Sequence, residues 1–171
     1  VSPEHVFVEG DVRDPEAIEK ALAGADAVVH LAAKVSVRGS VRGLAEDHEV
    51  NLGGTLRLLE AIQASEVHTF IHASSMAVYS DSPAGALVDE DHPTRPLSPY
   101  GASKLASEHY VRLVCERAGV ASLSLRLFNT WGPGQRVSPY VGVLTTFLDR
   151  ARARQPCVIY GDGAQVRDFV H

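Results

Sequence analysis

Two side chains that can handle a proton, Tyr100 and Lys104, stand four positions apart in the sequence, just after Pro99. A proline in the first turn is typical of a helix start, and residues four apart on a helix share one face. An ammonium that close favours the ionised phenol, so we expect the pKa of Tyr100 to be lowered from its usual value of about 10. A tyrosine tuned in this way can exchange a proton with a sugar or alcohol hydroxyl near neutral pH.

A serine, Ser75, supplies a second hydroxyl just after the apolar run 69–73. This hydroxyl could bond the same substrate oxygen as Tyr100. Simpler alternatives exist for both features. Lys104 could be a solvated lysine near an ordinary helix start, and Ser75 could satisfy backbone groups at a strand end. The elements around these residues decide between the alternatives.

Alternating strand and helix signals run through the whole chain. A helix over 15–22 is indicated by Asp14 as its N-cap, a proline at its first position and a stop at Gly24. Leucine and isoleucine at spacings of three and four predict a long helix over 44–64. Similar signals predict strands over 5–10, 27–32, 68–73, 122–127 and 158–160, helices over 100–118 and 140–153, and loops over 34–43, 81–99 and 129–136.

Strands that alternate with helices predict an α/β fold, a doubly wound, Rossmann-like parallel sheet with helices on both faces. Ligands of such sheets bind beyond the C-terminal ends of the strands. Polar or small residues follow several predicted strands and should converge on that edge: Asp11, Ala32, Ala33, Ser75 and Asn129. Because Tyr100 can reach the same edge from its helix, a chemical role for the Tyr–Lys pair is favoured over an ordinary helix start.

The composition excludes several classes of partner. The chain has 171 residues and a formal net charge of −5, which argues against a nucleic acid, because that partner needs a basic face. No apolar run reaches about 18 residues and no basic-then-apolar leader is present, so we expect no membrane span and no signal peptide. Two cysteines, Cys115 and Cys157, are too few for a disulfide framework and indicate reduced thiols in a cytoplasmic protein.

The histidines do not predict a metal site. His68 and His72 lie four apart on a predicted strand, which separates their Cα atoms by about 13 Å. That distance is too long for two short ligands of one ion. We therefore expect no bound metal.

With these residues placed, the chain resembles the extended short-chain dehydrogenase/reductase family, and within it the NAD-dependent nucleotide-sugar epimerases and dehydratases. The resemblance runs through the whole chain and rests on the order and spacing of its motifs. These motifs are Gly10-Asp11-Val12, His30-Leu31-Ala32-Ala33, Asn51 with Gly54-Thr55, Ser74-Ser75 with Val78-Tyr79, Tyr100 with Lys104, Arg126 to Asn129, and Tyr160 to Asp168.

The resemblance implies roles by position. Tyr100 is implied as the catalytic acid/base, Ser75 as the hydroxyl that bonds the reacting sugar oxygen, and Lys104 as the residue that holds the nicotinamide ribose and tunes the tyrosine. NAD is the implied cofactor, with NADP left open, and its implied binding residues are Asp11, Val12, Leu31, Ala32, Ala33, Asn51, Ser74, Tyr100, Lys104 and Phe128. The implied substrate is a nucleotide sugar, bound by Ser75, Asn129 and Arg167. An arginine fork suits a diphosphate.

The Gly-x-x-Gly-x-x-Gly turn of this family is absent from the sequence. In the family this turn lies between the first strand and the first helix, and it would precede Val1. The chain also opens on the apolar stretch 6–8 and stops on the strand-like stretch 169–171. We therefore expect an internal fragment, inactive alone. It would be a partial NAD(P)-binding domain over 1–171 that lacks the first strand–helix–strand and most of the C-terminal substrate domain, with 129–171 including the beginning of the substrate-binding part.

The activity implied is 4-epimerisation of the sugar by transient hydride transfer to NAD. Dehydratases of the family carry Asp-Glu right after the catalytic hydroxyl residue, where this chain has Met76 and Ala77, so dehydration is disfavoured. A reductase, a decarboxylase and a non-catalytic dinucleotide-sensing module remain alternatives. The last is disfavoured, since a sensor would not need the serine, the tyrosine and the lysine together.

The resemblance also implies a homodimer through the helices predicted over 44–64 and 100–118. Apolar residues that could form the surface of the second helix are Leu105, Val111, Leu113 and Val114. The alternative is that these side chains only cover the sheet.

Overall fold

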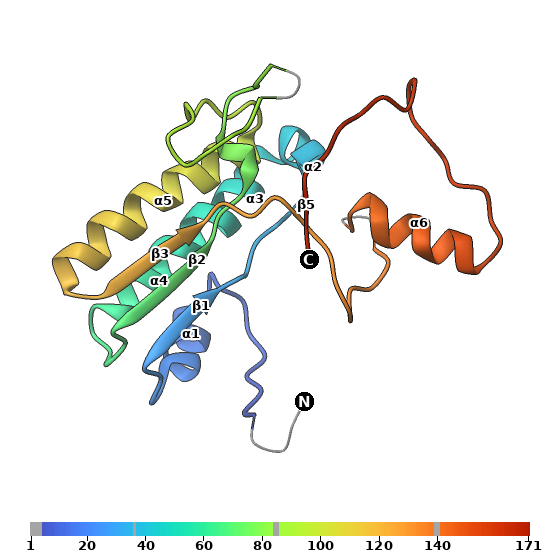
Figure 1. Ribbon diagram of the computed structural model, residues 1–171. Coiled ribbons are helices and arrows are strands. Elements are labelled where there is room, and N and C mark those ends of the chain that lie inside the picture. The colour runs from blue at the N-terminus through green and yellow to red at the C-terminus, as the bar shows by residue number, and fades with distance from the viewer. Residues whose placement is uncertain (1–4, 36, 84–85, 139–140) are drawn as a thin grey trace. The chain divides into compact units, whose positions relative to one another are not determined.

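A computed structural model describes residues 5–35, 37–83, 86–138 and 141–171 (Figure 1). The chain divides into two compact units, residues 1–126 and 127–171. Within the described ranges, no helix combines the length and the apolar character needed to cross a bilayer.

The first unit is built on a parallel sheet of three strands, β1 (Ala27–His30), β2 (Thr69–Ala73) and β3 (Ala121–Leu125). The strands lie in sequence order, with Val28 paired to Phe70. The prediction of a Rossmann-like α/β fold is thereby confirmed, and the strands predicted over 27–32, 68–73 and 122–127 are present with bounds that shift by one or two residues.

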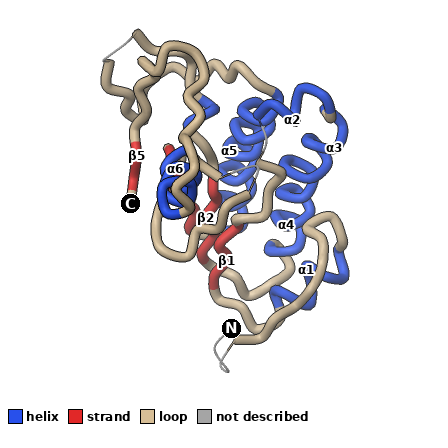
Figure 2. Tube along the Cα trace, turned by 90° about the vertical axis from the view of Figure 1, so that its right-hand side faces the viewer, coloured by secondary structure: helices blue, strands red, loops and turns tan. Residues whose placement is uncertain are grey.

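Helices α1 (Pro15–Leu22), α4 (Gly54–Ile62) and α5 (Pro99–Ala118) lie on one side of the three strands (Figure 2). The core lies between these helices and the sheet, where Phe70 is fully buried with Leu59 and Cys115. Burying such a side chain stabilises the fold by about 1.5–3 kcal/mol. The helix predicted over 15–22 is confirmed at both bounds, and Asp14 caps it by accepting from the backbone N–H of Glu16.

The opposite face of the sheet carries side chains that alternate with the buried ones. On this face Ile71 of β2 is paired with Val29 of β1 and with Leu123 of β3, and the side chains of Val29 and Leu123 are exposed. The described residues of the first unit thus provide one of the two helix layers that the sequence predicts.

The helix predicted over 44–64 forms as three successive segments, α3 (Leu44–His48), the π-helical η1 (Glu49–Gly53) and α4. The backbone N–H of Gly54 donates to the carbonyl of Glu49, five residues back. A Cβ at Gly54 would lie 2.5 Å from Cγ1 of Val12, so glycine lets the segment around Val12 pack against this helix. Single π-helical turns occur frequently at functional sites.

The prediction of a loop over 34–43 is wrong, because α2 (Val37–Arg42) forms there. Its Gly and Ser content favours a loop locally, but α2 packs against α3 and α5, and tertiary contacts override weak local propensity. A short 3₁₀ turn, η2 (Met76–Val78), follows β2.

The prediction of a strand over 5–10 is also wrong. These residues are described, yet they join no sheet, and Val6 and Phe7 are exposed. A strand needs a hydrogen-bonding neighbour along its edge, and among the described residues this segment pairs with none.

The second unit contains α6 (Val143–Arg152) and a parallel pair of short strands, β4 (Asn129–Thr130) and β5 (Phe169–Val170). The helix predicted over 140–153 is present from Val143, and Tyr140 lies outside the described residues. The predicted strand over 158–160 does not form although it is described, and β4 replaces the start of the loop predicted over 129–136. Pairing between segments far apart in sequence decides both differences, because apolar character alone does not supply a strand's partner.

Candidate active site

The first turn of α5 is fixed against the turn that follows β2. Ser98 caps the helix by accepting from the backbone N–H of Gly101 at 3.1 Å. A Cβ at Gly101 would lie 2.1 Å from the carbonyl oxygen of Ala77, so only glycine allows this approach. The contact places the start of α5 beside η2 and therefore beside Ser75.

Tyr100 and Ser75 meet at this contact. The Ser75 hydroxyl lies within reach of the Tyr100 phenol and acts to lower its pKa, and Tyr100 is buried. Ser75 Oγ also accepts from the backbone N–H of Ala77 at 3.2 Å, which leaves its single proton free to be donated to the tyrosine oxygen. The backbone N–H of Tyr100 donates to Ser40 Oγ at 3.2 Å, so α2 also holds the tyrosine.

The pKa of Tyr100 differs in direction from the sequence prediction. Burial raises this pKa, the hydrogen bond with Ser75 opposes the rise, and the negative charge of Asp47 adds to it. The prediction that Lys104 lowers the pKa of Tyr100 is therefore wrong in this structure. The physical reason is that desolvation of the phenolate outweighs the stabilisation that its surroundings provide.

Lys104 lies beneath the site with only 2% of its surface exposed. Its Nζ donates to the carbonyl oxygen of Ala73 at 2.8 Å, at the end of β2. Burial lowers the pKa of Lys104 to about 8, although the carboxylate of Asp47 works against that change. The lysine is thus a buried cation held by the strand end.

Ser74 lies in the chain between Ala73, which accepts from Lys104, and Ser75, which lies against Tyr100. Its hydroxyl donates to Glu108 on α5, and the side chain is nearly fully buried. The sequence prediction names Ser74 as a cofactor ligand, and in this structure its hydroxyl is engaged with the glutamate.

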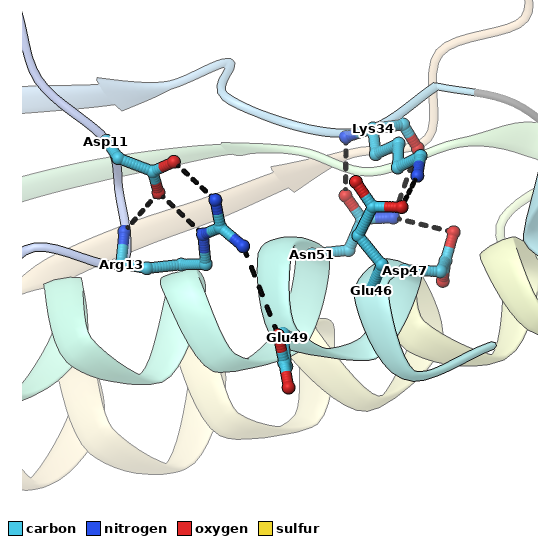
Figure 3. A network of polar contacts seen from close by, with 7 residues as sticks. All are labelled: Asp11, Arg13, Lys34, Glu46, Asp47, Glu49 and Asn51. Carbon is cyan, nitrogen blue, oxygen red and sulfur yellow. Dashed lines mark hydrogen bonds and ion pairs between the residues drawn. The ribbon is translucent and has the colours of Figure 1, made fainter. Parts of the chain in front are cut away.

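Asn51, in η1, holds the chain segment that follows β1 (Figure 3). Its Oδ1 accepts from the backbone N–H of Lys34 at 2.7 Å, and its Nδ2 donates to the carbonyl of Lys34 at 3.2 Å. Nδ2 also donates to Asp47 at 3.1 Å. Asn51 therefore fixes the backbone just beyond Ala33 at the C-terminal edge of the sheet.

Asp47 is a site residue that sequence reasoning missed. It is almost fully buried, and its carboxylate accepts from Asn51 and, at 3.0 Å, from the hydroxyl of Ser103. Its charge acts on both Tyr100 and Lys104. Its position four residues before Asn51, on one helix face, was the available signal.

A cavity of about 400 Å³ lies between β1 with the residues that follow it and α1 with the segment that precedes it. Four of the residues predicted to bind a cofactor line it: Asp11, Val12, Leu31 and Ala32. The volume lies within the range of small-molecule pockets, which are mostly apolar with a few polar groups. These walls fit part of a dinucleotide, with one carboxylate among apolar side chains.

Asp11 is the charged group of this cavity. Arg13 donates to both of its oxygens, through Nε at 2.9 Å and Nη2 at 2.7 Å. These hydrogen bonds lower the pKa of Asp11 to about 2. The carboxylate is therefore ionised across the physiological range.

Two buried histidines, His30 and His72, lie on the helix-covered face of the sheet with ring centroids 5.5 Å apart. Burial and the charge of Lys104 lower their pKa values to about 4 and about 3. The hydroxyl of Thr55 donates to a backbone carbonyl, so His30 Nε2 must be the donor in its 3.0 Å contact with that hydroxyl. Among the described residues, no group of three potential metal ligands comes together.

Phe128, Asn129 and Arg167 belong to the second unit. Asn129 Nδ2 donates to the carbonyl of Asp168 at 2.8 Å, which ties β4 to the residue before β5. Arg167 is exposed and donates to the carbonyl of its neighbour Val166. The predicted roles of these residues toward cofactor and substrate stay predictions.

Together, the parallel sheet and the Ser–Tyr–Lys group at its C-terminal edge define a Rossmann-like α/β protein with a candidate active site. A model of the NAD dependent epimerase/dehydratase family matches residues 2–171, and the chain belongs to that family. The resemblance seen in the sequence is thereby confirmed, and the family's named relatives are enzymes.

Solved structures of the family superpose closely on the chain. A UDP-glucose 4-epimerase of Thermus thermophilus, in complex with NAD, is 38% identical with a TM-score of 0.91, and the match covers 99% of this chain and 57% of that one. A UDP-glucose 4-epimerase of Thermotoga maritima, with UDP-glucose, is 32% identical with a TM-score of 0.91, covering 99% and 56%.

A curated relative has a different activity. The dTDP-glucose 4,6-dehydratase of Xanthomonas campestris is 33% identical over 181 residues, which cover 98% of this chain and 50% of the relative. The chain thus spans about half the length of the curated relatives it matches. Family membership therefore includes both epimerases and dehydratases.

Proposed function

We propose that the protein carrying this chain is a nucleotide-sugar 4-epimerase that uses NAD, with Tyr100 as its acid/base. The observation that carries the proposal is the Ser75 hydroxyl within reach of the Tyr100 phenol, with the buried ammonium of Lys104 one turn further along the same helix. This arrangement puts a proton acceptor and a hydrogen-bond donor side by side at the ligand-binding edge of the sheet.

In this proposal Tyr100 would take one proton from the sugar and later return it. Tyr100 would take the proton of the sugar 4-hydroxyl as a phenolate, a form that its burial disfavours and that a nearby nicotinamide cation would favour. Ser75 would donate a hydrogen bond to the sugar oxygen that is losing the proton. NAD, when bound by the residues around Asp11 and Ala32, would supply the acceptor for the C4 hydride and the source for its return to the opposite face of C4. Tyr100 then gives the proton back, so the reaction leaves no net oxidation.

The described residues support the cofactor assignment. Asp11, Val12, Leu31 and Ala32 line one cavity, and Asn51 fixes the backbone that follows it. Lys104 would reach the nicotinamide ribose from beneath Tyr100. The choice between NAD and NADP stays a prediction in favour of NAD.

Dehydration is the rival activity, because a dehydratase is among the relatives. Eliminating water needs a further acid and base beside the tyrosine. The resemblance puts these at the two positions after Ser75, where Met76 and Ala77 cannot transfer protons. Epimerisation needs neither group.

The test uses the full-length protein with NAD and follows conversion of UDP-glucose to UDP-galactose. Tyr100→Phe should lower kcat by about 10²–10⁴-fold, the usual contribution of a general acid/base. Tyr110→Phe is a matched control, since Tyr110 is on the same helix and 44% exposed. Unimpaired turnover by Tyr100→Phe would refute the role of Tyr100, and formation of a 4-keto-6-deoxy sugar from dTDP-glucose would favour the dehydratase.

We also propose that the protein is a homodimer in the cytoplasm. Leu113 on α5 is exposed and available to a second copy, whereas Val111 lies in the core of the first unit. Val111 therefore covers the sheet and is not available to a second copy, as the alternative to a dimer surface predicts for this residue. A Leu113→Glu variant should shift the mass measured by light scattering from two chains to one, and an unchanged mass would count against this helix as the interface.

A further inference from the structure

A nearly buried ion pair lies behind the candidate active site. Glu108 on α5 faces Arg126, just after β3, with 10% and 22% of their side chains exposed. Arg126 Nη2 lies 2.9 Å from Glu108 Oε2, and its Nε lies 3.0 Å from Oε1. This paired geometry is the stronger and more directional form of an arginine–carboxylate contact.

The pair is joined to the segment that carries Ser75. Glu108 Oε1, which accepts from Arg126, also accepts the hydroxyl proton of Ser74. Arg126 in turn donates to the carbonyl of Glu90 at 3.1 Å and lies 4.8 Å above the ring of Tyr79. Ser74, just before Ser75 in the chain, therefore contacts the glutamate of this ion pair, and Tyr79, four residues after Ser75, contacts the arginine.

One face of α5 contacts the end of β2 and the two residues that follow it. Residues four apart on this face each contact one of three consecutive residues at the strand end: Tyr100 contacts Ser75, Lys104 the carbonyl of Ala73, and Glu108 the hydroxyl of Ser74. Two of these helix residues are already part of the proposed chemistry. The third, Glu108, has its described hydrogen bonds with Ser74 and Arg126 and not with Tyr100.

We propose that Glu108 and Arg126 are positioning residues, which act through the Ser74 hydroxyl to hold Ser75 in hydrogen-bonding contact with Tyr100. This inference rests on the proposed function of Ser75 and Tyr100. Glu108 needs Arg126 because an unpaired carboxylate at this burial is costly. Because Arg126 holds the carboxylate of Glu108 in place, the hydrogen bond from Ser74 to that carboxylate holds the backbone next to Ser75 in place.

A purely structural ion pair would behave differently. Its loss would lower the free energy of unfolding and leave the folded enzyme's rate and pH profile unchanged. Loss of a positioning pair weakens the contact between Ser75 and Tyr100, which normally opposes the rise in the tyrosine's pKa. The pH limb that reports ionisation of Tyr100 should then move to higher pH.

The experiment compares Ser74→Ala and Glu108→Gln with wild type in the full-length protein with NAD and UDP-glucose. Each variant should lower kcat by about 3- to 10-fold with KM nearly unchanged, the effect of one misplaced hydrogen bond. In kcat/KM, the limb that rises with pH should shift upward by about half a pH unit. The double variant should lose no more than the larger single effect, because both changes break one connection.

The matched control is Glu116→Gln. Glu116 forms an ion pair with Arg112 on the same helix, at 3.6 Å, with 72% of the glutamate side chain exposed. This variant should keep the wild-type kcat and the wild-type pH limb. Circular dichroism and thermal melting show whether each variant is folded, and Ser74→Ala decides alone if Glu108→Gln is unfolded, because it leaves the ion pair in place.

Two failures are distinguishable. If Tyr100→Phe and Ser75→Ala lose activity while folded Ser74→Ala and Glu108→Gln keep the wild-type kcat and pH limb, the positioning role is overturned and the proposed function stands. If Tyr100→Phe keeps its activity, the proposed function is overturned and the positioning role falls with it.

Discussion

The ammonium of Lys104 donates to the carbonyl oxygen of Ala73 at 2.8 Å, so the lysine is held by the end of β2. Its burial lowers its pKa to about 8, and its charge adds to the burial that lowers the pKa values of the two histidines beneath it. Electrostatics at this edge of the sheet therefore depend on how deeply the lysine is buried as well as on its spacing from Tyr100.

The first prediction concerns Tyr100 itself. In protein stripped of cofactor, Tyr100 should ionise above its ordinary pKa of about 10, because burial disfavours the phenolate. The difference in phenolate absorbance between wild type and Tyr100→Phe, followed against pH, measures this ionisation. Ser75→Ala should move it higher still, since the hydrogen bond that opposes the rise is lost. A midpoint below the ordinary value would restore the original expectation that the lysine dominates.

The second prediction concerns stability in acid. Burial and Lys104 hold the pKa of His72 at about 3, below the ordinary 6.5 of an unfolded histidine. Between these values the unfolded chain binds more protons, so stability is lost as pH falls from 6.5 toward 3. For His72 this amounts to about 2 kcal/mol between pH 7 and pH 5. His72→Phe should lose less stability than wild type over that range, measured by urea unfolding.

A histidine on the surface provides the comparison for that measurement. His109 is exposed on α5, and His109→Gln should unfold with the wild-type pH dependence. His30 should still contribute in His72→Phe, because its own pKa is lowered to about 4. Identical pH slopes for wild type and His72→Phe would show that His72 does not carry this effect.

The third prediction concerns the close approach of α5 to η2. Gly101→Ala places a methyl group 2.1 Å from the carbonyl oxygen of Ala77, so the helix start must move away from Ser75. We expect a loss of stability of about 1–3 kcal/mol and a marked fall in kcat. Gly132→Ala is the control, since a Cβ there meets nothing within 4 Å. Wild-type kcat in Gly101→Ala would show that this approach does not set the site.

The fourth prediction concerns Asn51, whose side chain makes three hydrogen bonds that join η1 to the segment after β1 and to α3. Asn51→Ala leaves the backbone of Lys34 and the carboxylate of Asp47 without these partners. A cost of about 1–3 kcal/mol in the free energy of unfolding is expected, together with weaker binding of NAD measured by calorimetry. Gln63→Ala, which removes one contact to a helix carbonyl on α4, should leave NAD binding unchanged.

Local signals determined much of this fold. Asp14 with Pro15, and Ser98 with Pro99, mark the starts of α1 and α5, because an N-cap and a first-turn proline act within a few residues. The alternation of strands and helices predicted the parallel sheet. The spacing of Tyr100 and Lys104 put both on one face of α5, as the structure has them.

Tertiary structure decided what depends on residues far apart in the chain. Ser103 and Asp47 are 56 positions apart, and no local pattern announces their hydrogen bond. The sign of the pKa shift of Tyr100 was likewise out of reach, because it depends on desolvation by packed neighbours and not on spacing along a helix. The strand predicted over 5–10 failed for the same reason, since a strand exists only where another segment pairs with it.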